Sequence, residues 1–378
     1  MIKPLSTLCS YADGRIAVSD LNLENYISTE NMLPNKEGIV RSAGLPSISQ
    51  TQAYQADDVL VSNIRPYFKK IWLADRDGGC SNDVLVLRAS KDAYPSFLYY
   101  LLSDDNFFEY ATATAKGTKM PRGDKGAIMR YEVPILPFDM QVNIADMLAV
   151  LDSKIANNTK TNHHLEQIAQ AVYVKQFGLR EPNGVLGDYC TVKSGYAFKS
   201  SWWQENGVKV IKIKNITNTG LDLSDCSFVS DDKIAYAKDF IACAGDLLIA
   251  MTGATIGKFA IVPHSYEVLL VNQRVGKFFF NGDSAIEQLP FLWCSLKQDS
   301  IFNEIVSRGQ GSAQPNISPT DIISIPIFMP SVDELKDFNM NLQSSFESMI
   351  ANIAENVELA KLRDLLIPKL ISRELCAK

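Results

Sequence analysis

The sequence lacks the features of a metal cage, a disulfide framework or a membrane span. Its seven cysteines are odd in number, scattered and never spaced as C-x-x-C, which is typical of reduced thiols in a cytosolic protein. The pair His163 and His164 has no acidic or cysteine neighbour at ligand spacing. No apolar run approaches the roughly 18 residues of a membrane span, and the N-terminus carries no signal-peptide pattern. We therefore expect a cytoplasmic protein without metal or membrane contact.

Catalytic signatures are also missing. There is no Asn-Pro-Pro-Tyr-type motif for amino-methyl transfer, no glycine-rich loop for a methyl donor, no Walker motif and no nuclease carboxylate cluster. The segment Gly253–Phe259 is similar to a phosphate loop, but its first gap is one residue short and no Ser or Thr follows Lys258. We interpret it as a turn between strands. Because an enzyme would need such groups on this chain, we expect a protein without catalytic residues and without a cofactor.

Charge is distributed unevenly along the chain. The net charge of −6 is unusual for a DNA-binding protein, since phosphate contacts need Lys and Arg. Residues 116–130 nevertheless carry five cations against Asp124 alone, and residues 193–214 carry five lysines against Glu205 alone. Residues 331–358 carry six acids against Lys336 alone. This separation predicts distinct surfaces for different partners.

An internal duplication organises the 378 residues, a length that suits two domains. Gly117–Pro121 aligns with Gly311–Pro315 at an offset of 194 residues. A short apolar strand punctuated by prolines follows each loop, and a long stretch without Gly or Pro follows each strand. The corresponding pairs are Val133–Pro137 with Ile325–Pro330, residues 138–177 with 331–367, and, upstream, Asp58–Val61 with Asp246–Ile249.

The two long stretches have the apolar 4-3 spacing of paired helices. Asp139, and a capping box formed by Ser331 and Glu334, are expected at their starts; Gly178 and Pro368 are expected at their ends. Both helices place two asparagines at equivalent seam positions, which predicts a fixed register about a pseudo-two-fold axis. The expected pairing residues are Leu148, Ile155, Asn158, Asn162, Leu165, Leu342, Met349, Asn352, Asn356 and Leu359.

The segments before each helix contain short β-like runs and turns, interrupted by helical patterns at Pro95–Tyr110 and Ala285–Ser307. The expected fold class is α+β: two mixed α/β domains separated by two long helices that pair as an antiparallel coiled coil. The expected segments are 1–137, 138–180, 181–330 and 331–378.

This order of segments resembles the specificity subunits of Type I restriction-modification systems, over essentially the whole chain. The most specific stretch is Lys193-Ser-Gly-Tyr-Ala-Phe-Lys199 followed by Val210–Ile216; Gly245–Gly253, Val271–Arg274 and Gly311–Asn316 are also typical. The first half lacks the Gly-Tyr-Ala-Phe opening near residue 12. The resemblance implies that 1–137 and 181–330 are target recognition domains for a bipartite double-stranded DNA target. It also implies that the paired helices dock two modification (methyltransferase) subunits, which restriction subunits then join.

Candidate DNA contacts are basic, amide and aromatic residues of the loops that follow strands. In the first domain they lie in Asn63–Lys70 and in the loop 116–122; in the second they lie around Lys193–Lys214, in the turns after strands and in the loop 308–316. The candidates are Asn63, Arg65, Lys69, Lys116, Thr118, Lys119, Arg122, Lys193, Tyr196, Lys199, Lys212, Lys214, Thr252, Lys258, Arg274, Arg308, Gln310, Ser312, Gln314 and Asn316. We interpret Trp202 and Trp203 as domain packing.

Two alternatives remain open at this point. One is a protein-binding coiled-coil scaffold whose domains contact no DNA. The other is the recognition part of a fused restriction-methylation enzyme, against which the missing motifs argue. Under the specificity-subunit interpretation, the linker Gly178–Gly184 is expected to influence the gap between two half-sites.

Overall fold

The computed structural model describes residues 1–280, 284–309 and 315–372, and it divides into two compact units. Unit 1 comprises Met1–Lys154 and Leu359–Lys378, and unit 2 comprises Ile155–Glu358. Each unit therefore combines one α/β domain with part of both long helices. Among the described residues, no helix is long and apolar enough to cross a membrane.

Unit 1 contains two four-stranded sheets, of order β2-β9-β6-β7 and β3-β5-β8-β4, and a separate β1-β10 pair. All neighbours are antiparallel except β4 and β8. The strands are β1 (Ile2–Pro4), β2 (Cys9–Tyr11), β3 (Arg15–Ala17), β4 (Tyr26–Ile27), β5 (Gln50–Tyr54), β6 (Val59–Ser62), β7 (Ile71–Leu73), β8 (Gly78–Cys80), β9 (Val84–Ala89) and β10 (Glu132–Pro134). The helices are α1 (Pro95–Ser103), α2 (Asp105–Ala113) and α3 (Lys125–Met129), with short 3-10 turns η1 (Leu5–Thr7), η2 (Val18–Asp20) and η3 (Pro66–Phe68).

Unit 2 contains a four-stranded sheet of order β12-β20-β17-β18, a five-stranded sheet of order β13-β15-β14-β19-β16, and a β11-β21 pair. The strands are β11 (Gly184–Val185), β12 (Thr191–Ser194), β13 (Trp203–Gln204), β14 (Val208–Ile211), β15 (Ser227–Val229), β16 (Ile241–Ala242), β17 (Leu247–Ala250), β18 (Phe259–Ile261), β19 (Leu269–Val271), β20 (Val275–Phe279) and β21 (Pro326–Ile327). The helical elements are α5 (Ala285–Leu296), α6 (Asp299–Gly309), α7 (Pro319–Ile323), η4 (Leu186–Asp188), η5 (Ser200–Trp202), η6 (Ile213–Asn215), η7 (Asp231–Phe240) and η8 (Gly253–Thr255).

The two domains share one plan, as the internal repeat predicted. In the sheets β2-β9-β6-β7 and β12-β20-β17-β18, the first strand follows a 3-10 turn, η1 or η4, and pairs with the strand that comes last in the chain, β9 or β20. That last strand pairs in turn with β6 or β17, each of which begins directly after an aspartate. Asp58 and Asp246, the residues just before these strands, each accept a backbone hydrogen bond from the residue three positions earlier. Each is also ion-paired across the sheet, to Arg88 at 2.7 Å and to Lys277 at 2.5 Å. Unit 2 additionally carries the helix η7 and the strands β13 and β15, and these two strands extend its second sheet.

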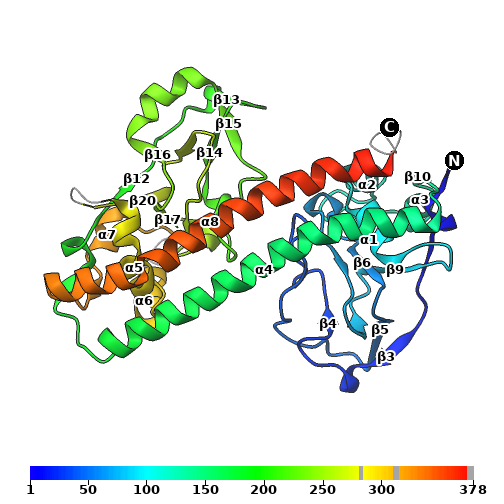
Figure 1. Cartoon of the computed structure of the whole chain (residues 1–378), viewed down its shortest axis with the longest axis horizontal. Coiled ribbons are helices and arrows are strands. Elements are labelled where there is room, and N and C mark those ends of the chain that lie inside the picture. The colour runs from blue at the N-terminus through cyan, green and yellow to red at the C-terminus, as the bar shows by residue number, and fades with distance from the viewer. Residues whose placement is uncertain (281–283, 310–314, 373–378) are drawn as a thin grey trace. The chain divides into compact units, whose positions relative to one another are not determined.

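The long helices α4 (Phe138–Phe177) and α8 (Val332–Ile371) pack together antiparallel, as predicted (Figure 1). The capping box is confirmed, because the amide of Ser331 donates to the Glu334 carboxylate at 3.0 Å. Two predicted ends are wrong. Asp139 lies inside the first turn rather than before it, and the helix begins directly after Pro137. Pro368 lies inside α8, which continues to Ile371 because the last turn is buried in the core of unit 1 and outweighs the lost hydrogen bond.

Each domain buries one face of its helices against the nearest part of α4 and α8. In unit 1, Ile144, Leu148 and Ile367 share a core with Phe97 of α1. In unit 2 the corresponding core contains aromatic side chains from α4, α5 and α8; Tyr173, Phe291 and Phe338 lie within about 6 Å of one another, ring centre to ring centre. Pro290 interrupts the bonding of α5, and Asn339 of α8 accepts a hydrogen bond from the amide of Phe291 at 3.0 Å. This contact ties the domain to the helix pair.

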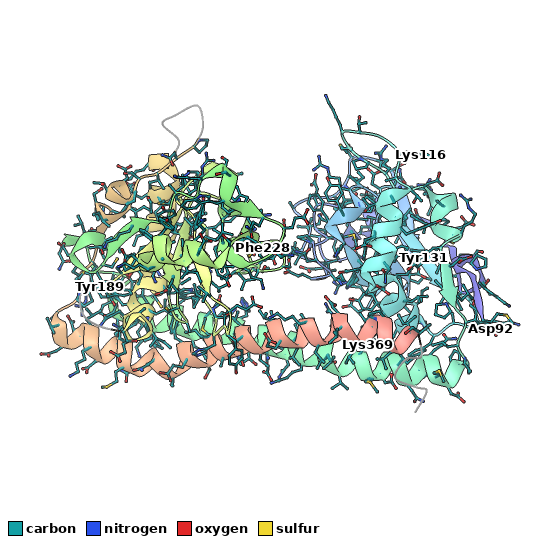
Figure 2. The ribbon with its side chains drawn as sticks, turned by 90° about the horizontal axis from the view of Figure 1, so that it is seen from above. Asp92, Lys116, Tyr131, Tyr189, Phe228 and Lys369 are labelled. Atoms are coloured by element: carbon teal, nitrogen blue, oxygen red, sulfur yellow. The ribbon has the colours of Figure 1, made fainter. Side chains whose placement is uncertain are left out.

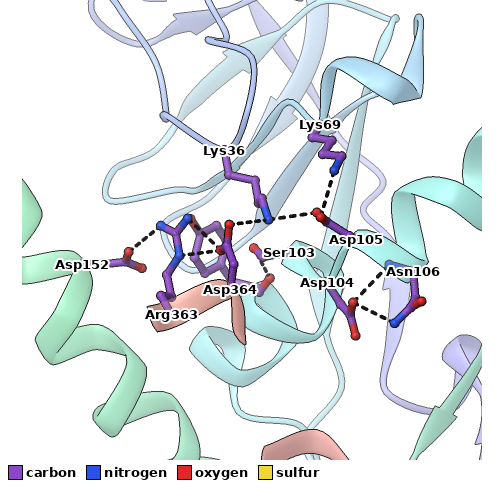
Figure 3. Close-up of polar contacts among 10 residues, drawn as sticks. Lys36, Lys69, Ser103, Asp104, Asp105, Asn106, Asp152, Arg363 and Asp364 are labelled. Carbon is purple, nitrogen blue, oxygen red and sulfur yellow. Dashed lines mark hydrogen bonds and ion pairs between the residues drawn. The ribbon is translucent and has the colours of Figure 1, made fainter. Parts of the chain in front are cut away.

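A partly buried chain of charges joins the domain of unit 1 to the last turns of α8 (Figure 3); its cations Lys36 and Arg363 are buried. The Lys36 ammonium lies 3.0 Å from Asp105 and 3.2 Å from Asp364. Arg363 bonds to Asp152 of α4 at 2.7 Å and to Asp364 at 2.9 Å. Burial disfavours the charged guanidinium, but the two carboxylates outweigh this and raise the pKa of Arg363. Domain, α4 and α8 are thereby joined through paired charges.

Candidate nucleic-acid interface

In unit 1, three segments that are distant in sequence meet beyond the end of β6. The amide of Asn63 donates to the Asp83 carbonyl at 2.8 Å, and the amide of Arg65 donates to the Pro121 carbonyl at 2.8 Å. The amide of Gly123 donates back to the Asn63 carbonyl at 3.1 Å. We name this group of residues 62–65, 81–84 and 121–123 turn cluster 1. It brings the candidates Asn63, Arg65 and Arg122 together.

In unit 2 an equivalent set of bonds recurs beyond the end of β17. The amide of Met251 donates to the Arg274 carbonyl at 3.1 Å, and that of Gly253 donates to the Pro315 carbonyl at 2.9 Å. The amide of Ile317 donates to the Met251 carbonyl at 2.9 Å. Residues 250–253, 272–275 and 315–317 form turn cluster 2, which unites the candidates Thr252, Arg274 and Asn316. Pro121 and Pro315 occupy the same place in the two clusters, at the offset of 194 residues that the sequence repeat predicted.

A cavity of about 570 Å³ opens at turn cluster 2. Met251, Ile317 and prolines 315 and 319 form its apolar part, and polar side chains complete it. Its polar lining consists of Ser194, Thr252, Gln273, Arg274, Asn316 and Ser318. Gly195 is required beside it, since a Cβ at this position would lie 2.3 Å from the Val271 carbonyl oxygen.

Most cations near turn cluster 1 are already ion-paired within the chain. Arg122 lies 3.0 Å from Asp83, and Lys69 lies 2.9 Å from Asp105. Lys116 lies 2.5 Å from Asp124; its hydrogen bond and the amide of Ala127 lower the pKa of that carboxyl to about 2. Lys116, Thr118 and Lys119 are exposed. Figure 2 shows Lys116 on the side of unit 1 opposite to Lys369 of α8.

The cations of unit 2 are held mainly against aromatic rings. Lys193 lies over Phe279 and Lys199 over Trp202, 5.0 and 5.5 Å from the ring centres. Lys212 lies 3.5 Å from the centre of the Trp203 ring, and burial, followed by the charge of Lys214, lowers the pKa of Lys212. Lys214 is paired with Asp225 at 2.6 Å. Tyr196 stacks on Trp202 with 6° between the ring planes. Both rings and that of Trp203 pack against the core around Phe198, which agrees with the expected packing role of the two tryptophans.

The remaining candidates are placed differently. Arg308 is committed to intramolecular bonds with Glu304, the Asp321 carbonyl and Ser324. Lys258 lies directly before β18, beyond the turn formed by η8, which agrees with the expected turn. The candidates Gln310, Ser312 and Gln314 lie outside the described residues.

Sequence reasoning missed Asp83 and Gln273. Asp83 pairs with Arg122 across turn cluster 1, and Gln273 lines the cavity of turn cluster 2. Gln273 lies within the motif Val271–Arg274, so its neighbour Arg274 was the signal that could have found it. No local signal marks Asp83, because its partner is 39 positions away in the sequence.

Polar pairs occupy the middle of the seam between α4 and α8, within unit 2. The Asn158 amide donates to Asn356 at 2.9 Å and to Glu355 at 2.7 Å. Asn352 donates to Asn162 at 2.8 Å, and Asn162 donates to the Met349 carbonyl at 3.1 Å. Of the other seam candidates, Leu148, Leu342 and Met349 are buried, and Ile155, Leu165 and Leu359 are half-buried.

Comparison with known proteins agrees with this architecture. The family model of the Type I restriction modification DNA specificity domain matches residues 16–167 and again 183–358. The chain is 25% identical to the Type I restriction enzyme MjaVIII specificity subunit of Methanocaldococcus jannaschii, over 70% of this chain and 67% of that protein. It is 23% identical to the HindI specificity subunit of Haemophilus influenzae, over 93% and 94% of the two chains.

Among solved structures, the Type I restriction-modification S subunit from M. genitalium superposes with a TM-score of 0.54 at 18% identity. The match covers 98% of this chain and 96% of that chain, so the fold is shared over nearly the whole length. Since the family model matches both halves separately, each half corresponds to one copy of the domain. The chain belongs to the family of Type I restriction-modification DNA specificity subunits.

Proposed function

We propose that this DNA specificity subunit reads a two-part double-stranded target, one part with each target recognition domain. The observation that supports this most directly is the repeated turn cluster. The same backbone bonds recur in both units, and each cluster contains arginine and amide side chains. These are the residue types that pair with guanine and adenine edges in the major groove. The domain limits proposed are 1–137 and 181–330, with the helical segments 138–180 and 331–378 between and after them.

The helix pair is proposed as the docking surface for two modification subunits. Large apolar side chains remain exposed on both helices, and two pairs of them repeat at the offset of 194 residues: Phe138 with Val332, and Ile168 with Leu362. Exposed apolar residues at equivalent places are typical of a surface that receives two copies of one partner. A groove of about 410 Å³ beside Met140, Met147 and Leu370 adds to this surface in unit 1.

Catalysis is assigned to the partners. In this proposal the chain supplies recognition and position, the modification subunits supply methyl transfer, and restriction subunits join that core in the cytoplasm. An assay of methyl transfer by the isolated chain tests the division of labour, with activity expected only when modification subunits are added.

Methylome sequencing tests the proposed function as a whole. Cells that carry this gene together with its modification partner should show methylation at one bipartite sequence, and cells that carry the partner alone should not. Methylation at an undivided sequence, or methylation independent of this gene, would contradict the proposal.

A further inference from the structure

Arg65 adopts a left-handed backbone conformation, and the residue at the equivalent position of the other domain is a glycine, Gly253. The amides of Arg65 and Gly253 make the same bond, to the carbonyls of Pro121 and Pro315. Both residues have a left-handed backbone, with φ of +50° at Arg65 and +71° at Gly253. L side chains rarely adopt this conformation, and the residue before a proline, here Pro66, is restricted further. The arginine therefore stands at this position against the local backbone preference, which points to a role for its side chain.

The Arg65 side chain also forms no ion pair with the described residues. Its Nε is buried and has no hydrogen-bond partner among the described residues. The neighbouring Arg122 differs, since Asp83 neutralises it at 3.0 Å. Within turn cluster 1, Arg65 is thus the guanidinium that no described carboxylate pairs. Its backbone is held in place by the bond to Pro121 and by the η3 turn that follows.

Turn cluster 2 presents an arginine from a different position. Arg274 occupies the place of Asp83, because the carbonyls of these two residues accept equivalent bonds from Met251 and Asn63. The side chain of Arg274 is exposed, lines the cavity and forms no ion pair with the described residues. Gln273 and Asn316 lie in the same lining. Each cluster therefore carries one unpaired arginine on a backbone that hydrogen bonds fix.

Phosphate contact needs only charge, which the exposed lysines 119, 193 and 199 already provide. A fixed guanidinium beside amide side chains is instead suited to the O6 and N7 acceptors of guanine, where its planar fork makes two parallel bonds. We propose that Arg65 and Arg274 each read one guanine, in the half-site of their own domain. The inference rests on the proposed function and adds the residues that determine specificity.

The test replaces each arginine by lysine in the full chain, assembled with its modification subunits. R65K and R274K keep the charge and remove the fork. Duplex libraries randomised in one half-site at a time then give the relative affinity for every base at every position. R65K should reduce discrimination at one G·C pair of one half-site by roughly tenfold to a hundredfold, and R274K should do so in the other half-site. The salt dependence of binding should remain unchanged.

R41K and R180K provide matched controls, one in each unit and both outside the turn clusters. They should retain the base preferences of the original chain. R65G provides a second measurement, because glycine suits the left-handed backbone: its thermal midpoint should not fall, while discrimination in the first half-site should be lost. A lower midpoint would show that the arginine serves the fold, and would overturn the inference for Arg65.

Other results are equally decisive. Uniform loss of affinity across all sequences in R65K and R274K would make both residues phosphate contacts and overturn the inference. So would unchanged preferences, or an effect of both variants on the same half-site. An original chain that bound no bipartite sequence selectively would instead contradict the proposed function itself.

Discussion

At the residue scale, the chain uses paired charges in two very different settings. Arg363 is buried between Asp152 and Asp364, whereas Arg180 meets Glu334 at 2.7 Å near the surface of unit 2. A buried cation that is removed leaves its carboxylates unpaired, while an exposed pair is screened by water. Only the buried contact should contribute substantially to stability.

We predict that R363M lowers the free energy of unfolding of unit 1 by about 2–4 kcal/mol, because Asp152 loses its cation and Asp364 keeps Lys36 alone. R180M, the matched exposed control, should lower that of unit 2 by less than about 1 kcal/mol. Denaturant unfolding followed by hydrogen exchange in each unit measures both values. Equal effects of the two substitutions would show that the buried charges contribute no more than surface pairs.

The start of α8 has a pH dependence of predictable sign. The amide of Ser331, then Arg180 and the Ser331 hydroxyl, lower the pKa of Glu334 to about 2, from its usual value of 4.5. A carboxyl with a lowered folded-state pKa stabilises the fold above the unfolded value, and the contribution is lost as the pH falls from about 4.5 towards 2.

We therefore predict that E334Q flattens the acid side of the stability profile between pH 4.5 and pH 2. Thermal midpoints of the original and substituted chains, measured at intervals over this range, should converge as the pH falls. E347Q is a suitable control, since Glu347 lies on the same helix but outside the capping box. A profile of E334Q parallel to that of the original chain would contradict the assignment.

At the scale of elements, the seam of the helix pair combines apolar ends with a polar middle. Asn158 is 3% exposed, yet its neighbours across the seam are Asn356 and Glu355. Buried amides of this kind stabilise one register because any shift would leave them without partners. The strength of the contact is accessible to a double-mutant cycle.

We predict that N158A lowers the free energy of unfolding by about 1–3 kcal/mol, since it removes a buried amide and leaves the half-buried Asn356 oxygen without its donor. N356A should behave similarly, and the two effects should be coupled by about 0.5–3 kcal/mol because the side chains are in contact. Denaturant titration of both single variants and of the double variant gives the coupling. Strictly additive effects would show that the Asn158–Asn356 bond does not help to fix the register between α4 and α8.

The elements that could be predicted from sequence are those with a local signal. The 4-3 spacing predicted α4 and α8, and the repeat predicted the equivalence of Pro121 and Pro315. The prediction that α8 ends at Pro368 was wrong, because its neighbours Ile367 and Leu370 are buried in a core formed largely by residues more than 200 positions away. The turn clusters and the Lys36–Asp364 pair were likewise beyond reach, because no local pattern encodes which distant loops meet.

At the scale of the whole molecule, the division into units changes one expectation. The linker Gly178–Gly184 was expected to influence the gap between half-sites. Arg180 contacts Glu334, and Asn183 contacts Met329, so both sides of the linker belong to unit 2. The parts of the chain that join the units are instead the helices, near residues 154 and 358.

We predict that inserting two glycine or serine residues after Glu181 leaves the gap of the methylated target unchanged. Had the linker set the spacing, added span of about 3.4 Å for each residue would shift the gap by about one base pair. Methylome sequencing reports the gap directly. A wider gap would show that the linker does set the distance between the half-sites. It would contradict the assignment of both sides of the linker to unit 2.

Exchange of a whole domain is the sharpest consequence of the two-unit architecture. Replacing residues 1–137 by the corresponding segment of a relative should change one half-site, and leave both the other half-site and the gap as they were. The reason is that contacts to the bases determine which sequence each domain reads, while the helices determine where the domains are held. The graft must preserve the contacts that join domain and helices, above all Lys36 with Asp364 and Tyr100 with Asp152.

In a control chimera, only the joining residues Lys36 and Tyr100 are replaced. This control distinguishes a change in DNA recognition from a failure of the domain to pack on the helices. It should lose thermal stability in unit 1, because Asp152 and Asp364 lose partners there. Methylome sequencing of the chimera that keeps these contacts, beside the original chain, then tests whether each domain reads its half-site independently. If it altered both half-sites, or neither, recognition would have to be shared between the domains, and the turn clusters would not act as independent reading sites.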